Sequence, residues 1–292
     1  MLNFDFHNPT HIVFGKGRVA DLAKLVPAAA KVLILVGGAS AEKTGTLAEV
    51  RAALGERQHA TFSGIEPNPS FETSMKAVDQ VRSGGFDFLL AVGGGSVIDA
   101  VKFIAAAVHF EGDAWAILEK RGRNITQAVP FGAVLTLPAT GPEMNNGSVI
   151  THRGKGAKLA FSSVHTYPLF SVLDPTKTYT LPPQQLANGV VDAFVHTVEQ
   201  YLTYPVNAPV QDRFAEGILH TLIEVGPRLL TAPEPVYDDR ANLMWAATMA
   251  LNGLIGAGVP QDWATHMIGH ELTALHNIDH ARTLAIVLPA LP

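Results

Sequence analysis

The sequence predicts an α/β part that extends to about residue 180, followed by an all-helical part. In the first part, short apolar runs alternate with amphipathic stretches, which is the pattern of parallel strands joined by helices. The second part is helical in pattern throughout, without a clear strand. The pair Pro182-Pro183 is a favourable helix start, so we expect two domains, residues 1–181 and residues 182–292.

Each expected strand is an apolar run that closes at a turn. Five such runs occupy residues 31–36, 60–65, 86–92, 133–137 and 169–173. The amphipathic stretches between them predict helices at residues 46–54, 71–81 and 96–108. In the second part, helices are expected at residues 184–202, 210–222, 240–253 and 263–275.

The composition excludes several classes of protein. The 292 residues include no cysteine, which excludes a disulfide-stabilised secreted scaffold. The 21 Lys and Arg residues are scattered and outnumbered by 26 Asp and Glu, so we expect a small-molecule ligand and no nucleic acid. The first ten residues carry no targeting pattern, and charges or glycines interrupt the most apolar stretches, so we expect a cytoplasmic protein without a membrane span.

Two glycine-rich turns follow expected strands. The turn Gly93-Gly94-Gly95-Ser96 lies between a strand and a helix, where glycine lets a phosphate approach backbone N–H groups at the helix N-terminus. The alternative is a tight turn that only needs a positive φ. Because Gly37-Gly38-Ala39-Ser40 follows another strand, two such turns would lie at the carboxyl ends of strands in one sheet, where open α/β sheets bind ligands.

The first turn also bears on the choice of nucleotide. The spacing is not the Gly-x-Gly-x-x-Gly fingerprint, and no acidic residue directly follows Val36 to hold a ribose 2′-hydroxyl. A bound dinucleotide could therefore carry a 2′-phosphate, for which Ser40 and Lys43 would supply a hydroxyl and a cation. Two solvated polar residues at the start of a helix are the alternative.

The helical part contains residues spaced like metal ligands. Asp192 and His196 are four residues apart on an expected helix, so their side chains share one face. Of 12 histidines, four fall within fifteen residues: His266, His270, His276 and His280. Three imidazoles and one carboxylate would bind a divalent transition metal, and a hydrogen-bonded Asp–His pair is the alternative. The four clustered histidines cannot all bind one ion, since such a site has few positions.

Covalent catalysis is not predicted, because the chain has no cysteine and no Gly-x-Ser-x-Gly elbow. The motifs instead resemble the iron-containing alcohol dehydrogenase family: residues 93–99 (GGGSVID) with Lys102, the Asp192/His196 pair and the segment from His266 to His280. Residues 14–17 (FGKG), 63–69 (SGIEPNP) and 187–196 look like the bacterial NADPH-dependent aldehyde reductase and butanol dehydrogenase branch. The resemblance extends from about residue 3 to the last residue.

This resemblance implies a dehydroquinate synthase-like fold: a Rossmann-like dinucleotide-binding domain, an all-helical metal-binding domain and an active site in the cleft between them. The implied metal ligands are Asp192, His196, His266 and His280. His270 is implied to lie close to the nicotinamide and the substrate. The implied dinucleotide contacts are Gly37, Gly38, Ser40 and Lys43 at the adenosine, Asn68, Gly94, Gly95 and Ser96 at the phosphates and ribose, and Thr136, Thr140 and Lys158 towards the nicotinamide.

The implied activity is hydride transfer between NADPH and an aldehyde or primary alcohol, in a homodimer with one Zn²⁺ or Fe²⁺ ion as Lewis acid. His270 or a cofactor ribose hydroxyl would donate the proton. NAD-preferring relatives carry an aspartate in place of Gly37, and such an acid would repel a 2′-phosphate. Low polarity around Trp263 and Met267 favours short aliphatic or aromatic aldehydes.

The chain also departs from the family pattern. The usual Thr-Gly-Ser-Glu reads Thr140-Gly141-Pro142-Glu143, which removes a hydroxyl and a backbone donor beside the expected cofactor path. Family members continue past Pro292, so we expect an incomplete helical domain. A glycerol dehydrogenase-like enzyme, a sugar-phosphate cyclase and a non-catalytic nucleotide- or metal-binding chain are the alternatives. A phosphate-binding basic cluster in the second domain would favour the cyclase, and residues 192–280 are poor in Lys and Arg.

Overall fold

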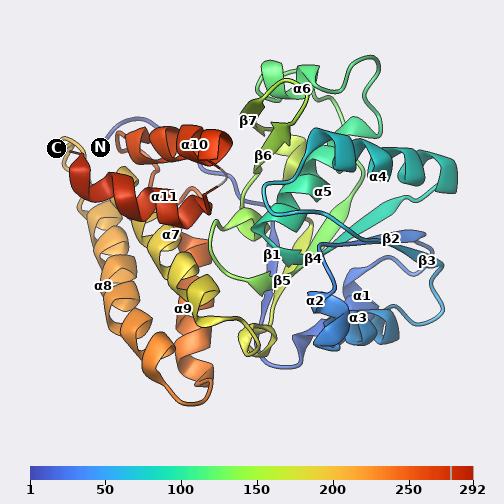
Figure 1. The fold of residues 1–292 in the computed structure, drawn as a ribbon, viewed down its shortest axis with the longest axis horizontal. Helices are drawn as coiled ribbons and strands as arrows, with labels where there is room; N and C mark the ends of the chain where they lie inside the picture. Colours follow the sequence, from blue (N-terminus) through green and yellow to red (C-terminus); the bar gives the residue numbers. More distant parts are fainter. Residues whose placement is uncertain (277, 292) are drawn as a thin grey trace. The chain divides into compact units, whose positions relative to one another are not determined.

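The computed structural model describes residues 1–276 and 278–291 and divides into two compact units (Figure 1). The α/β unit comprises Pro9–Thr136 and Pro142–Lys177. The helical unit comprises Met1–Asn8, Leu137–Gly141 and Thr178–Pro292. The expected boundary at residue 182 lies shortly after the start of the last segment, and separate domains at residues 1–181 and 182–292 stay a prediction.

The α/β unit is built on a six-stranded sheet in the order β1-β8-β5-β4-β2-β3. Its strands are β1 (His11–Phe14), β2 (Val32–Val36), β3 (His59–Phe62), β4 (Phe88–Gly94), β5 (Phe131–Leu137) and β8 (Phe170–Leu173). The strand pairs whose register is described are parallel, so the predicted parallel sheet is confirmed. Five strands coincide with the predicted apolar runs. The sixth, β1, was not predicted because it has only four residues and begins with a histidine.

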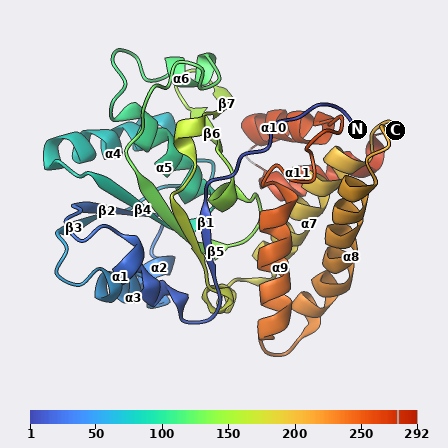
Figure 2. The ribbon, with the colours of Figure 1, turned by 180° about the vertical axis from the view of Figure 1, so that it is seen from behind.

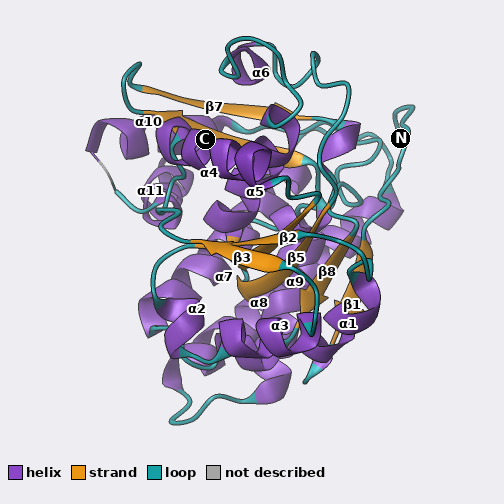
Figure 3. Ribbon diagram, turned by 90° about the vertical axis from the view of Figure 1, so that its right-hand side faces the viewer, coloured by secondary structure: helices purple, strands orange, loops and turns teal. Residues whose placement is uncertain are grey.

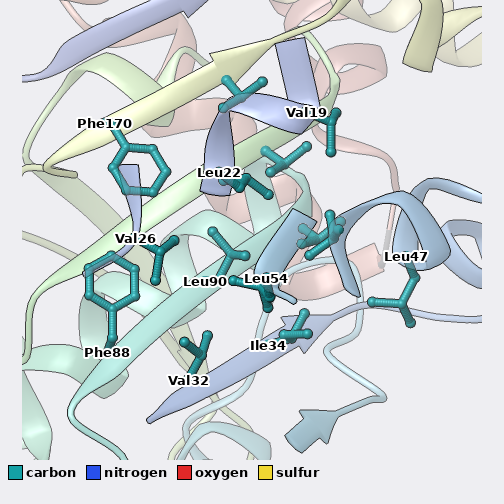
Figure 4. Close-up of a cluster of buried hydrophobic side chains, with 14 of the residues drawn as sticks. Val19, Leu22, Val26, Val32, Ile34, Leu47, Leu54, Phe88, Leu90 and Phe170 are labelled. Carbon is teal, nitrogen blue, oxygen red and sulfur yellow. The ribbon is translucent and has the colours of Figure 1, made fainter. Parts of the chain in front are cut away.

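Helices cover both faces of this sheet (Figures 1 and 3). On one face lie α1 (Leu22–Leu25), α2 (Ser40–Lys43) and α3 (Thr46–Leu54), and on the other lie α4 (Phe71–Gly84) and α5 (Gly95–Ala107). All five residues of β2 are buried, because side chains alternate between two covered faces. Its residues Val32 and Ile34 join Leu22 and Leu54 in the core under α1 and α3 (Figure 4).

An antiparallel hairpin lies beside this sheet and was not predicted. It consists of β6 (Gly147–His152) and β7 (Ala157–Ser162). The buried positions of β6 are Ser148 and Ile150, so its alternation is not one of apolar and polar residues. β6 packs against α5, where the buried ammonium of Lys102 donates hydrogen bonds to Asn145 Oδ1 at 2.7 Å and to the carbonyl of Gly147 at 2.8 Å.

The helical unit contains α7 (Pro183–Tyr201), α8 (Pro209–Thr231), α9 (Tyr237–Ala250), α10 (Ala264–His276) and α11 (His280–Val287). α7, α8 and α9 lie side by side around a common apolar core (Figure 2). α8 continues through Pro227, nine residues beyond its predicted end at residue 222. Among the described residues, none of the helices combines the length and hydropathy that a membrane span requires.

Close approaches at two glycines position α7 and α10. A Cβ atom on Gly189 of α7 would lie 2.4 Å from the carbonyl oxygen of Pro138, so the segment Leu137–Gly141 packs directly on the backbone of this helix. A Cβ atom on Gly269 of α10 would lie 2.8 Å from Oγ1 of Thr283 in α11. The missing side chain at Gly269 therefore allows α10 and α11 to pack closely.

Candidate metal centre

Three ionisable side chains lie on one face of α7. Asp192, His196 and Glu199 follow one another at intervals of four and three residues, which places them on successive turns of the same face. They are 3%, 4% and 6% exposed, respectively. Buried ionisable groups are costly unless they are paired or bind a metal, so this face of α7 requires partners.

Those partners come from α10 and α11. Oδ1 of Asp192 lies 3.5 Å from Nδ1 of His196, 3.8 Å from Nε2 of His266 and 4.0 Å from Nε2 of His280. Potential ligand atoms of Asp192, His196 and His266 all lie within 4.8 Å of one another. Nitrogen and oxygen ligands of one tetrahedral ion are about 3.4 Å apart. The structure thus brings together the four residues that the resemblance implied as ligands.

The chemistry of these atoms fits a divalent cation. Oδ1 of Asp192, Nδ1 of His196 and Nε2 of His266 are buried and have no hydrogen-bond partner among the described residues. Buried polar atoms without partners are rare in proteins, and here three of them face one point. One carboxylate and three imidazoles are ligands that Zn²⁺ and Fe²⁺ accept. An ion of this kind would satisfy all three atoms.

The protonation states also suit a cation. Burial alone would raise the pKa of Asp192, but the neighbouring His196, His266 and His280 outweigh burial and hold this pKa at about 2. Burial lowers the pKa of His196 to about 4 despite the nearby Asp192 carboxylate. At neutral pH, Asp192 is therefore an anion and His196 is neutral, as metal binding requires.

Glu199 was not singled out by the sequence analysis. Its Oε2 makes a hydrogen bond with Nδ1 of the His266 ring, and its Oε1 accepts a second one from the His266 backbone N–H at 3.3 Å. Burial would lower the pKa of His266, but the carboxylates of Asp192 and Glu199 outweigh this effect and raise it. The available signal was the spacing of Glu199, seven residues after Asp192 on the same helical face.

The other clustered histidines lie at different distances from this centre. The ring centroid of His270 is 4.9 Å from that of His280 and 6.4 Å from that of His266. His276 is exposed at the end of α10 and is not among the residues whose ligand atoms lie together. The Trp263 ring is 5.3 Å from His266, whereas Met267 is 54% exposed. Asn277, which follows His276 in the sequence, lies outside the described residues.

The two glycine-rich turns are neighbours in the α/β unit. Gly37 and Gly38 follow β2, while Gly94 ends β4 and Gly95-Ser96 begins α5. β2 pairs directly with β4, so both turns lie at the carboxyl ends of adjacent parallel strands. A Cβ atom on Gly37 would lie 3.1 Å from the Ile65 carbonyl oxygen and 3.6 Å from Cγ2 of Val97. Ser40 and Lys43 are exposed in α2, directly after the first turn.

In the turn between β4 and α5, Gly93 has a steric role and not a conformational one. Gly93, Gly94 and Gly95 do not have positive φ angles, so the alternative of a turn that needs a left-handed residue is wrong. A Cβ atom on Gly93 would lie 2.6 Å from Cγ2 of Val97. The absence of a side chain at Gly93 therefore lets the start of α5 lie close to β4, and no side chain caps the N-terminus of this helix.

The remaining implied cofactor contacts are distributed over both units. Nζ of Lys158 in β7 donates a hydrogen bond to Oδ1 of Asn68 at 2.9 Å, and Asn68 adopts a left-handed φ of 54°. Thr136 lies at the end of β5 in the α/β unit, whereas Thr140 belongs to the helical unit. Pro142, where the usual motif has serine, begins a short 3₁₀ helix, Pro142–Met144, in which the first N–H needs no helical partner.

Comparison with known families agrees with this geometry. Residues 9–175 match the family described as iron-containing alcohol dehydrogenase, and residues 186–291 match the C-terminal part of the Fe-containing alcohol dehydrogenase family. The chain belongs to the iron-containing alcohol dehydrogenase family. The resemblance and the fold expected for this family are therefore confirmed.

Several members of the iron-containing alcohol dehydrogenase family are similar over the whole chain. The NADPH-dependent aldehyde reductase YqhD of Escherichia coli is 63% identical over 100% of this chain and 76% of its own length. The NADH-dependent butanol dehydrogenase A of Clostridium acetobutylicum is 40% identical over 99% of this chain and 75% of its own length. The chain thus spans about three quarters of the length of these relatives.

Solved structures of this family are equally close. The crystal structure of Escherichia coli YqhD superimposes with a TM-score of 0.97 at 62% identity and covers 99% of this chain and 74% of that protein. The NADH-dependent butanol dehydrogenase A of Thermotoga maritima has a TM-score of 0.94 at 39% identity and covers 99% of this chain and 73% of that protein. Iron-containing alcohol dehydrogenases of the aldehyde reductase and butanol dehydrogenase branch therefore share its fold.

Proposed function

We propose that this protein is a metal-dependent oxidoreductase that transfers hydride between NADPH and an aldehyde or primary alcohol. The observation that carries this proposal is the set of buried ligand atoms of Asp192, His196 and His266, without hydrogen-bond partners among the described residues and within 4.8 Å of one another. It is supported by 63% identity with an NADPH-dependent aldehyde reductase. The glycine-rich turns at the ends of β2 and β4 supply the corresponding nucleotide site.

Asp192, His196, His266 and His280 would hold the ion. A divalent metal bound there supplies Lewis acidity towards a carbonyl oxygen. The four residues come from α7, α10 and α11, which pack against one another. This packing would hold the ion, and a carbonyl oxygen bound to it, in a fixed position. Three imidazoles and one carboxylate suit Zn²⁺ and Fe²⁺ equally, so metal analysis must name the ion.

The α/β unit would hold NADPH. The N–H groups at the start of α5 would bind phosphate, and Ser40 and Lys43 would contact the 2′-phosphate. The relatives differ in cofactor: the Escherichia coli reductase is NADPH-dependent, whereas the Clostridium acetobutylicum enzyme is NADH-dependent. Here position 37 is a glycine and contributes no negative charge, which favours the phosphorylated cofactor.

His270 is the candidate proton donor. Its ring lies 4.9 Å from the His280 ring, beside the proposed ligands and not among them. Its place on α10, one turn after His266, directs it to the same side of the helix. A proton reaching the alkoxide product through His270 would complete the reduction. Replacing His270 with glutamine should then change the pH–rate profile, and an unchanged profile would remove it from the relay.

The deciding experiment is NADPH oxidation with butanal by the purified 292-residue chain. We expect activity that disappears after chelation and returns when either Zn²⁺ or Fe²⁺ is added back. Asp192→Asn should abolish this recovery, whereas the exposed His276→Gln on α10 serves as a matched control that retains it. A folded, metal-loaded chain that fails to oxidise NADPH, whichever aldehyde is supplied, would favour the non-catalytic alternative and overturn the proposal.

The relatives reported above favour neither a glycerol dehydrogenase nor a sugar-phosphate cyclase. Short aliphatic or aromatic aldehydes are the proposed substrates, since the apolar side chains of Trp263, just before α10, and Met267, on its first turn, flank His266 in the sequence. A homodimer and a cytoplasmic location stay predictions.

A further inference from the structure

Glu199 is a buried carboxylate whose hydrogen bonds serve a single neighbour. Its side chain is 5% exposed, and among the described residues all its side-chain hydrogen bonds go to His266. Its backbone carbonyl accepts a hydrogen bond from the N–H of Asp262 at 2.9 Å, just before α10 begins. Glu199 therefore holds the first turn of α10 and the His266 ring at the same time.

The contact with the ring determines which nitrogen of His266 faces Asp192. When the His266 ring is neutral, its single N–H is the one that Oε2 of Glu199 accepts at Nδ1, so the other nitrogen, Nε2, carries the lone pair. Nε2 is buried, lies 3.8 Å from Oδ1 of Asp192 and has no hydrogen-bond partner among the described residues. The ring is thus held with a lone pair directed towards the cluster of ligand atoms.

We propose that Glu199 is a positioning residue that fixes the tautomer and the orientation of His266 for metal binding, an inference that rests on the proposed function of this centre. A carboxylate that accepts the second N–H of a metal-binding histidine also raises the basicity of the ligand nitrogen. α7 then supplies both a direct ligand, Asp192, and the support of a ligand on another helix. The spacing between these two residues keeps both on one face.

The structure also offers a matched control on the same helix. Thr197 is fully buried on α7, and its hydroxyl donates a hydrogen bond to the Ala193 carbonyl at 2.8 Å and not to His266. Thr197→Val removes a buried polar group of similar size from the same helix. It tests whether any loss of metal affinity follows from a general disturbance of α7.

The test is metal binding to the apo chain and two variants, Glu199→Ala and Glu199→Gln, followed with Zn²⁺ by chelator competition and with Co²⁺ by visible absorption. We expect Glu199→Ala to weaken Zn²⁺ binding by about 10- to 100-fold and to alter the Co²⁺ spectrum. Glu199→Gln keeps an acceptor oxygen for Nδ1–H, so it should restore part of the affinity. Thr197→Val should bind Zn²⁺ like the parent.

Two results would overturn the inference. A Glu199→Ala variant that folds like the parent and keeps its Zn²⁺ affinity and Co²⁺ spectrum would show that Glu199 does not position His266. If Glu199→Ala does not fold, a Glu199→Met variant, which fills more of the space but also lacks an acceptor oxygen, leads to the same conclusion if its affinity and spectrum are unchanged. A parent chain that binds neither ion stoichiometrically would instead overturn the proposed metal centre, and with it this inference.

Discussion

The ammonium group of Lys158 lies 2.9 Å from the side-chain carbonyl oxygen of Asn68 and joins β7 to the loop that precedes α4. Asn68 holds a left-handed backbone conformation, which few residues other than glycine and asparagine adopt readily. Two residues that are 90 positions apart in the sequence thus form one polar contact. Both residues were expected to contact the dinucleotide. Their hydrogen bond places the positive charge of Lys158 beside the loop of Asn68, where it could bind a negatively charged cofactor.

We expect Lys158→Met to weaken NADPH binding and to leave metal binding unchanged. A charged hydrogen bond contributes about 1.5–3 kcal/mol, which corresponds to about a 10- to 100-fold rise in the dissociation constant of NADPH. Fluorescence titration with NADPH measures this constant directly. Lys155→Met, on the turn of the same hairpin and exposed, is the control; equal constants for the two variants would contradict a cofactor role for Lys158.

Gly37→Asp should shift the cofactor preference from NADPH towards NADH. The new carboxylate would repel a 2′-phosphate, so the ratio of kcat/KM for NADPH to that for NADH should fall by at least about tenfold, or 1.4 kcal/mol. Gly37→Ala separates charge from volume, because its Cβ would also lie 3.1 Å from the Ile65 carbonyl oxygen. If alanine changes the ratio as much as aspartate does, repulsion is not the cause.

Gly269→Ala should loosen the packing between α10 and α11. Its Cβ would lie 2.8 Å from Thr283 Oγ1 and 3.1 Å from Leu284 Cδ2, so the two helices must separate. We expect a loss of stability of about 1–3 kcal/mol and weaker Zn²⁺ binding, because His266 and His280 lie on these two helices. Gly217→Ala in α8, where no atom lies within 4 Å, should instead stabilise by about 1 kcal/mol. Thermal unfolding with and without Zn²⁺ distinguishes the two variants.

The buried Lys102 should make stability depend on pH above neutrality. Burial lowers its pKa from the ordinary 10.5 to about 7, against the opposing influence of Asp99 and Glu143. Between these two values the unfolded chain binds more protons than the folded one, so the free energy of unfolding rises with pH. The rise is at most about 1.4 kcal/mol per pH unit.

Lys102→Met removes this contribution. Urea unfolding of the parent and of Lys102→Met at pH 7.5 and pH 9 should give a difference in stability, parent minus variant, that grows with pH. A difference that stays constant across this range would mean that Lys102 keeps an ordinary pKa in the folded protein.

The sequence predicted the parallel sheet because each central strand is a continuous apolar run, of which β2 is the clearest case. It did not predict the β6–β7 hairpin, whose buried face includes Ser148 and is held by the ammonium of Lys102. Interactions of this kind join distant residues and leave no local period. α8 was predicted to end at residue 222, whereas the helix continues to Thr231 and through Pro227, a residue type that normally ends a helix.

Of the candidate site, the sequence predicted the proposed metal ligands but not the residue that supports one of them. The residues proposed as ligands were found by spacing and by resemblance, since histidines clustered on an apolar helix are uncommon. Glu199 was not predicted as part of the site, because a glutamate on a helix is normally exposed to solvent. Only the three-dimensional contact between Glu199 and the ring of His266 reveals its role.

The helical unit is assembled from three separate stretches of chain, and this affects the order in which the two units can fold during synthesis. By Lys177 the ribosome has produced every segment of the α/β unit. The first eight residues, by contrast, wait for a partner that is synthesised much later, since the N–H of Leu2 donates to the carbonyl of Gly258 at 2.8 Å. His266 and His280 emerge later still. A nascent chain therefore completes its nucleotide-binding turns first and can hold a metal with all four proposed ligands only after His280 has been made.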